Sequence, residues 1–266
     1  MSMPHSDLEN ARLREDMLRE LNLYPLWQRR SMPDAPATVA MEAAHVEPEA
    51  IPVAVVKVKE EVAQLDVSKL SWAALKKTVK NCTACSLRAG CMQTVFGSGD
   101  ENADWLFVGS WPTEDDETSG LPFSGAAGHL LDNMLAAIKL KRDQKVYLST
   151  VVKCSGSIRR GPQAQQIEQC APYLARQIQL LKPKIIVVLG HSTATAMLGE
   201  DREWNSLLGK LHHYQSTTEN GTQTTIPLII THHPAALMLT PLNKAQTWRD
   251  LCLARDTMAH LTQSES

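Results

Sequence analysis

The sequence predicts an α/β protein in which a mostly parallel sheet is layered between helices. Short apolar runs bounded by turn residues alternate with longer segments that carry apolar residues at helical spacing. One run, residues 185–189, contains no polar residue, which is typical of a strand covered on both faces. Such alternation implies parallel strands joined by crossover helices. A chain of 266 residues with 43% hydrophobic content can bury one sizeable core.

The main domain is predicted over residues 68–262. Its first helix, 71–79, leads directly into a Cys-x-x-Cys pair. Apolar runs then predict strands, and apolar residues at intervals of three or four predict helices. The predicted strands are 105–109, 146–152, 185–189 and 227–231. The predicted helices that follow them are 129–140, 164–181, 192–198 and 243–261.

The N-terminal quarter of the chain is predicted to be separate from this domain. Residues 1–33 carry apolar residues at helical spacing among charged ones, which predicts a short amphipathic helix that docks on the main domain or on a partner. Residues 34–67 are rich in Pro, Ala, Val and Glu and lack helix caps, which predicts a flexible linker. The expected anchors of the docking peptide are Leu18, Leu21, Leu23 and Trp27.

Composition argues against several classes of protein. A net charge of −2 provides no global field that recruits nucleic acid, so any contact with DNA requires a local basic face. No apolar run reaches the length of a membrane span, and the N-terminus lacks the hydrophobic region of a signal peptide. We therefore expect a cytoplasmic protein without a membrane partner, whose six cysteines do not form structural disulfides.

Four of the cysteines stand in a pattern typical of metal ligation. They are Cys82, Cys85, Cys154 and Cys170. Four thiolates that converge from a loop pair and a later pair can hold a [4Fe–4S] cluster or a zinc ion. The Cys-x-x-Cys pair alone is weaker, because it could be redox-active or incidental. Cys91 is a less favoured ligand, and Cys252 is expected to be a small buried hydrophobe.

A polar loop, residues 109–123, follows the first predicted strand. It contains glycine and proline residues, four consecutive acids at 114–117, and Phe123 at its end. Open α/β sheets place ligand sites where a strand ends in such a loop before a helix. The alternative is an ordinary connecting loop with a solvated acidic run.

Several motifs occur in a fixed order along the main domain. They are Cys82-Thr-Ala-Cys85, Val95-Phe-Gly-Ser-Gly99, Gly120-Leu-Pro-Phe-Ser-Gly-Ala-Ala-Gly128, Val151-Val-Lys-Cys154, Cys170-Ala-Pro-Tyr-Leu174 and His233-Pro-Ala. With them, residues 69–262 resemble the iron–sulfur uracil-DNA glycosylases, the family 4 type. The resemblance implies a three-layer α/β/α sandwich, a [4Fe–4S] cluster on the four cysteines, and a pocket for uracil flipped out of DNA.

The resemblance also implies roles for residues of the pocket. His233 polarises uracil O2, the base stacks on Phe123, and Asp116 and Glu117 are acids that survive in the first loop. Lys153, Arg159 and Arg160 flank the cluster cysteines and are candidate contacts to DNA phosphate.

Three positions of the pocket depart from the family pattern. Ser110 stands where the family has its catalytic glutamate, Trp111 replaces a small residue, and Thr150 replaces the asparagine that reads uracil. A hydroxyl carries no charge, and threonine cannot make the bidentate contact of an amide. These departures predict a DNA-binding protein of repair or replication with weak or lost uracil excision. The alternative is an active glycosylase that uses His233 and Asp116.

The N-terminal segment carries a second resemblance. Leu18, Leu21, Leu23 and Trp27, followed by Arg29-Arg30, are similar in spacing to the N-terminal peptide of psi, a clamp-loader-associated subunit of the bacterial replicative DNA polymerase. Leu and Trp are good anchors for a peptide that orders on binding. This resemblance implies a non-catalytic adaptor that contacts the clamp loader or another replisome subunit.

Overall fold

The computed structural model of the protein describes residues 66–156, 161–218 and 221–264. These residues belong to one compact unit, which spans Glu61–Ser266. The docking peptide predicted at 1–33 and nearly all of the linker predicted at 34–67 lie outside the described residues. Both, together with the proposed clamp-loader contact, stay predictions. None of the helices in the described ranges is both long and apolar enough to cross a membrane.

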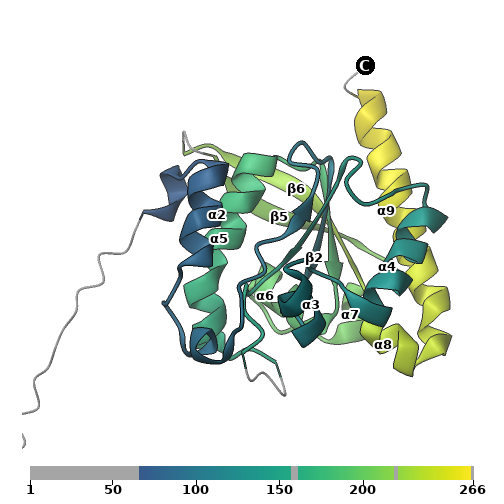
Figure 1. The fold of residues 1–266 in the computed structure, drawn as a ribbon. Coiled ribbons are helices and arrows are strands. Elements are labelled where there is room, and N and C mark those ends of the chain that lie inside the picture. Colours follow the sequence, from purple (N-terminus) through teal and green to yellow (C-terminus); the bar gives the residue numbers. More distant parts are fainter. Residues whose placement is uncertain (1–65, 157–160, 219–220, 265–266) are drawn as a thin grey trace, which may run out of the picture. The chain divides into compact units, whose positions relative to one another are not determined.

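A six-stranded mixed sheet forms the centre of the domain (Figure 1), and it confirms the predicted α/β class. The strands lie in the order β1-β3-β2-β4-β6-β5. The four central strands are parallel, and the two edge strands pair antiparallel to their neighbours. The bounds are β1 Ser98–Gly99, β2 Trp105–Gly109, β3 Val146–Thr150, β4 Ile185–Leu189, β5 Leu211–Thr217 and β6 Gln223–Thr231.

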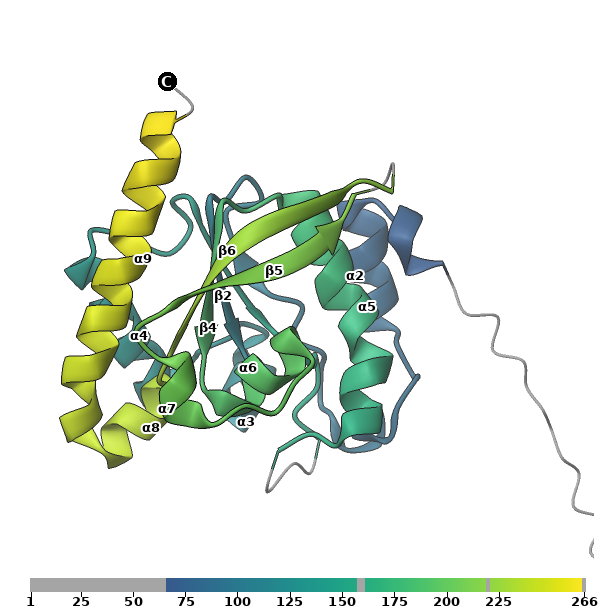
Figure 2. The same ribbon diagram turned by 180° about the vertical axis from the view of Figure 1, so that it is seen from behind.

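Helices cover both faces of this sheet, as the predicted sandwich requires. Figures 1 and 2 show α2 (Trp72–Lys80) and α5 (Ala164–Leu181) on one side. On the other side lie α4 (Gly125–Ala137) and α9 (Lys244–Ser264). The short elements that complete the chain are η1 Val67–Lys69, η2 Ser86–Gly90, α3 Glu114–Ser119, α6 His191–Leu198, α7 Trp204–Leu207, α8 Pro234–Leu239 and η3 Pro241–Asn243.

The core is divided between the two faces by the strict alternation of side chains along the strands. In β2, Leu106 and Val108 join the core on the α2/α5 face, whereas Trp105 and Phe107 join the core on the α4/α9 face. Every residue of β2, β3 and β4 is buried. A strand covered on both sides has no solvated face, which explains the continuous apolar runs in the sequence.

The structure differs from the predicted elements in several places, among them β6, which begins at Gln223 and not at the predicted Pro227. The acidic run at 114–117 is not a loop but begins the helix α3, which Thr113 caps. Helix α4 begins and ends earlier than the predicted 129–140. β3 ends at Thr150, two residues before the predicted end, and β5 was not predicted. β5 is a half-exposed edge strand, and its polar residues mask the apolar pattern that identifies a central strand.

Candidate functional site

The site lies at the end of the sheet where the parallel strands have their carboxyl termini. It is next to β2, because the strands that follow β2 in the sequence are added first on one side of it and then on the other. From β2 the chain continues through α4 to β3 on one side, and from β3 it returns through α5 to β4 on the other. Helices α4 and α5 cover opposite faces. A crevice opens at such a switch point in an open α/β sheet. The sequence motifs of the first loop and of His233 both follow strands that end here.

Gly109, at the end of β2, is the point at which two aromatic rings meet. A Cβ atom at this position would lie 2.6 Å from Cζ of Phe123 and 3.7 Å from Nε2 of His233. The rings of Phe123 and His233 are 5.8 Å apart between centroids, at an interplanar angle of 33°. Only glycine at position 109 leaves room for the Phe123 ring to come this close. The three residues come from separate segments of the chain, and the structure brings them together at this point.

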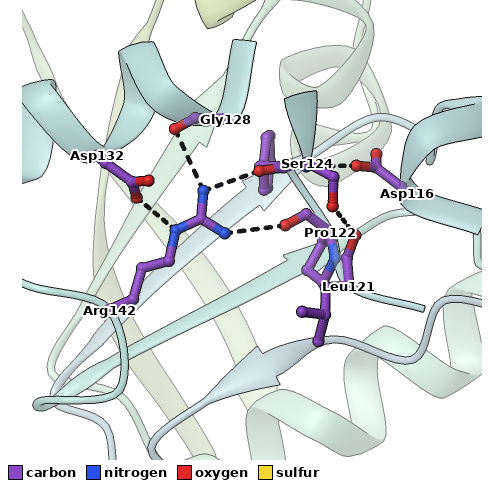
Figure 3. A network of polar contacts seen from close by, with 8 residues as sticks. Asp116, Leu121, Pro122, Ser124, Gly128, Asp132 and Arg142 are labelled. Carbon is purple, nitrogen blue, oxygen red and sulfur yellow. Dashed lines mark hydrogen bonds and ion pairs between the residues drawn. The ribbon is translucent and has the colours of Figure 1, made fainter. Parts of the chain in front are cut away.

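Arg142 holds the loop that carries Phe123, and this residue was not found by sequence reasoning. Its guanidinium donates hydrogen bonds to the carbonyl oxygens of Phe123 (2.8 Å), Pro122 (3.2 Å) and Gly128 (3.2 Å), and it pairs with Asp132 (Figure 3). Phe123 itself has a φ angle of 57°, which is unusual for a bulky residue. A Cβ atom at Gly128 would overlap the Phe123 carbonyl oxygen. The network therefore fixes a strained backbone beneath the Phe123 ring.

Thr150 lies on the same face of the sheet as Phe123. It pairs with Gly109 in the register of β2 and β3. Because side chains alternate along β3 and Leu148 joins the Phe123 side of the core, Thr150 points to that side as well. Thr150 is buried, and its hydroxyl is the one buried side-chain polar atom in the described residues without a hydrogen-bond partner. A buried polar atom without a partner is unfavourable, and a ligand that bonds to it removes that cost.

His233 presents a hydrogen-bond donor toward the same point. Its Nδ1 accepts a hydrogen bond from the backbone N–H of Ala235 (3.2 Å), at the start of α8. The proton of the neutral ring therefore resides on Nε2, the atom near Gly109. Burial lowers the pKa of His233 to about 4, against the opposing effect of the Asp116 carboxylate. The ring is consequently a neutral donor at physiological pH.

The lowered pKa of His233 predicts a pH-dependent contribution to stability. The unfolded chain takes up this proton near pH 6.5, whereas the folded protein takes it up near pH 4. The contribution is therefore complete above pH 6.5 and is lost as the pH falls toward 4. Denaturant unfolding curves of wild type and His233→Gln check this. As the pH is lowered from 6.5 to 4, the free energy of unfolding of wild type should fall relative to that of the variant. A difference independent of pH would contradict the assignment.

Asp116 is buried, and both of its carboxylate oxygens are occupied. Oδ1 accepts the backbone N–H of Ser124 (2.5 Å), and Oδ2 accepts that of Thr113 (2.8 Å). Figure 3 shows the first of these contacts. The solvated acidic run considered for this segment is therefore wrong at Asp116. Geometry favours a role in holding the two ends of the loop, and a role in water activation stays a prediction.

The other two substituted positions differ in their surroundings. Ser110 is half-buried at the end of β2, and its carbonyl oxygen accepts the backbone N–H of Val152 (3.1 Å). The ring of Trp111 lies about 3.6 Å from the position of a Cβ atom on Gly161, and it packs with the core on the α2/α5 face. Phe123, Thr150 and His233 thus surround Gly109, whereas Trp111 lies toward the segment that follows Cys154.

The four predicted ligand cysteines line one cavity. Its walls also contain apolar residues, among them Val79, Leu87 and Val152. The sulfur of Cys82 accepts hydrogen bonds from the Tyr173 hydroxyl (3.3 Å) and the Ala84 N–H (3.5 Å). The cysteines on this cavity are Cys82, Cys85, Cys154 and Cys170. The structure therefore gathers the cysteines that the sequence singled out.

The donor set suits a group with several positive centres. Burial raises the pKa of the Cys170 thiol to about 11 and raises that of Cys154 further, so thiolates here require compensating positive charge. Across the described ranges, no three His, Cys, Asp or Glu side chains are arranged to hold a single metal ion. In a [4Fe–4S] cluster each thiolate binds a different iron, so the sulfurs surround a cavity and do not meet at one point. The residues present fit such a cluster.

Lys153 is buried, so the prediction that it binds phosphate is wrong. Its side chain is 2% exposed, and Nζ donates to the Thr150 carbonyl (2.7 Å), the Ser149 hydroxyl (2.8 Å) and Gln177 Oε1 (2.7 Å). Burial lowers the pKa of Lys153 to about 7. These hydrogen bonds connect the carboxyl end of β3 to Gln177 of α5 and so hold that end of the strand in place. Arg159 and Arg160 lie outside the described residues, and their predicted phosphate contacts stay predictions.

Comparison with known proteins agrees with this geometry. The family model described as the uracil DNA glycosylase superfamily matches residues 96–254, which include the first loop and His233. The chain belongs to this superfamily. It is 34% identical over 169 residues to the type-4 uracil-DNA glycosylase of Archaeoglobus fulgidus, a match that covers 62% of this chain and 82% of the relative.

Other type-4 uracil-DNA glycosylases are similarly related to this superfamily member. That of Pyrobaculum aerophilum is 34% identical over 181 residues, covering 67% of this chain and 90% of the relative. That of Sulfurisphaera tokodaii is 37% identical over 168 residues, covering 63% of this chain and 76% of the relative. These matches confirm the resemblance on which the pocket and cluster assignments depend.

Proposed function

We propose that this protein binds DNA and receives a flipped-out uracil in the pocket around Gly109, with slow hydrolysis of the N-glycosidic bond. A base must leave the stack before any protein group can reach the bond to its sugar. One observation carries the proposal: Thr150, whose buried hydroxyl has no partner among the described residues, pairs with Gly109, the residue that Phe123 and Nε2 of His233 approach. A planar ligand with hydrogen-bonding edges satisfies all three groups.

The residues of the pocket would divide the work of the reaction. Water adds across the bond between C1′ and N1, and the base departs with the electron pair of that bond. The Nε2–H of His233 would stabilise the negative charge that develops on uracil O2. Phe123, held by Arg142, would stack on the base and fix its plane. The proton lost by the water is taken up by the departing base or by solvent.

The groups that the pocket lacks explain why the proposed excision is slow. Positive charge develops on the sugar, and a nearby carboxylate stabilises it and activates the water. Ser110 offers only a hydroxyl at the position where the family has glutamate. The Asp116 carboxylate is already bonded to two backbone N–H groups, which limits its use as a base. The single oxygen of the Thr150 hydroxyl cannot donate to one atom of the base edge and accept from the neighbouring one in the side-by-side geometry of an amide. An amide carries its donor and its acceptor on two different atoms and so forms both hydrogen bonds in a fixed pattern.

We further propose that Cys82, Cys85, Cys154 and Cys170 hold a [4Fe–4S] cluster. Such a cluster would cross-link segments far apart in the sequence and supply the positive centres that buried thiolates require. Support comes from the shared cavity and from the hydrogen bonds that Cys82 accepts. Membership of the uracil DNA glycosylase superfamily supports DNA as the substrate or binding partner.

Single-turnover cleavage of a uracil-containing single strand tests the proposal, together with equilibrium binding of the same strand. We expect binding of the strand with slow excision, and a further loss of about 10²-fold in rate for His233→Ala, the typical effect of removing one charge-stabilising donor. The control is His213→Ala, an exposed histidine on the edge strand β5.

Two outcomes would decide against the proposal. Fast excision by wild type, dependent on His233, favours the active glycosylase. Binding no tighter than that of an unrelated acidic protein, and equal with and without uracil, excludes a base-binding pocket. A strand with a non-cleavable uracil nucleotide separates binding from chemistry in the same experiment.

A further inference from the structure

Two neighbouring carboxylates of α3 bond to different parts of the molecule. Asp116 accepts the backbone N–H groups of Thr113 and Ser124, which begin and end the loop that carries Phe123. Glu117 accepts the N–H of Met92 (3.0 Å) with Oε2 and the N–H of Ser155 (2.7 Å) with Oε1. Both side chains are 3% exposed. One turn of helix thus binds four backbone N–H groups, one from its own N-cap and three from other segments.

The partners of Glu117 belong to the segments that carry cysteines. Ser155 directly follows Cys154, and Met92 directly follows Cys91. The side chain of Gln93 also donates to the backbone carbonyl oxygen of Glu117, which adds a contact from the same segment. Cys154 lines the cavity assigned to the cluster. Glu117 therefore lies on the cysteine side of α3, and Asp116 lies on the pocket side.

The covalent spacing makes this arrangement stiff. Asp116 and Glu117 are adjacent in a helix of six residues, whose cap is Thr113. A shift of the Cys154 segment pulls on Glu117, and α3, which moves together with its cap Thr113, cannot follow without disturbing the bond of Asp116 to Ser124. Ser124 directly follows Phe123, the ring expected to stack on the base. Charge-assisted hydrogen bonds of this kind are about twice as strong as neutral ones, which suits them to transmit such a displacement.

We propose that Glu117 is a positioning residue that couples the cysteine cavity to the base pocket, so that loss of the cluster loosens the loop 113–124. This inference rests on the proposed function, because it assumes a cluster in the cavity and a base in the pocket. It adds a way in which the state of the cluster regulates base binding, through a residue that contacts neither. Coupling between such sites is typically 5–150-fold in affinity.

Hydrogen exchange of the backbone amides tests the coupling without reference to catalysis. The variants are Glu117→Gln, which weakens the acceptor, Glu117→Asp, which retains the charge, and Glu114→Gln, an exposed acid on the same helix as control. In protein that holds its cluster, Glu117→Gln should exchange faster than wild type at Met92 and Ser155 and also across 113–124. Glu117→Asp should restore part of the protection, and Glu114→Gln should match wild type.

Removal of iron with a chelator provides the second arm of the experiment. Wild type should lose protection across 113–124 and bind a uracil-containing strand about tenfold more weakly, within the usual range of coupling between sites. Glu117→Gln should show little further change on iron removal, because its coupling is already broken. Unfolding curves for each variant distinguish this local effect from global instability.

Three results would overturn the inference. Protection across 113–124 that survives iron removal in wild type excludes the coupling, as does a Glu117→Gln variant identical to Glu114→Gln. Protein purified anaerobically without iron removes the cluster on which the coupling depends. If the protein binds no uracil-containing strand but the exchange pattern is as expected, the proposed function fails and the coupling stands.

Discussion

The Ser110→Glu/Thr150→Asn double variant is expected to excise uracil about 10³-fold faster than wild type, or more, in a single-turnover assay. Glutamate at 110 adds a negative charge at the end of β2, where the first loop begins. Asparagine at 150 offers a donor and an acceptor together on the face that Phe123 shares. The first change should stabilise the positive charge that develops on the sugar. The second should form the paired hydrogen bonds that distinguish uracil from cytosine.

The matched control for this variant is Ser110→Gln/Thr150→Asn, which has nearly the same shape without the charge. It should improve discrimination between uracil and cytosine strands in the binding assay and leave the rate of excision near that of wild type. If the double variant with glutamate excises no faster than this control, the missing carboxylate is not the cause of slow chemistry.

The Cys170→Ser variant is expected to lose its iron and to unfold far more easily than wild type. Cys170 lies on α5, whereas Cys82 and Cys85 follow α2, so a cluster between them ties two helices to one cavity. Ligands that bind only the folded state add their binding free energy to stability. We expect the free energy of unfolding to fall by roughly 3 kcal/mol or more, a stabilisation that tight ligands commonly provide.

Cys252→Ser is the control, because this half-buried cysteine lies on α9 and is not among the residues that line the cavity. Iron and inorganic sulfide are measured beside anaerobic unfolding curves. A Cys170→Ser protein that retains four irons and wild-type stability would remove Cys170 from the ligand set. Equal losses in both variants would show that any serine substitution destabilises the fold.

Much of the fold was predictable because the central strands are continuous apolar runs in the sequence. β2, β4 and α5 occupy the residues predicted for them, since a strand buried on both faces or a long amphipathic helix leaves a regular apolar pattern. β5 was missed because one edge strand with a solvated face has no such pattern. Helix α3 carried a recognisable signal, since Thr113 and Asp116 form a capping box whose spacing the sequence displays.

The candidate site was predictable only where a motif marks it. Phe123, His233 and the four cavity cysteines were found from their motifs, and the structure brings each group together. Arg142 was not found, and Glu117 was marked only as a retained acid of the first loop, because their partners lie 10 to 38 residues away in the sequence. Lys153 was misjudged for a related reason: a lysine beside a cysteine motif resembles a surface charge until its burial is known.

The segment from Thr150 to Cys154 has a consequence for how this protein can change over generations. Only three residues separate Thr150 from Cys154, and Lys153, which lines the cysteine cavity, donates a hydrogen bond to the Thr150 carbonyl. An insertion or deletion there would displace the wall of the pocket or that of the cysteine cavity. Selection can therefore retune what this edge of the sheet accepts most directly by exchanging one side chain for another, and a substitution at Thr150 breaks no side-chain hydrogen bond of the scaffold.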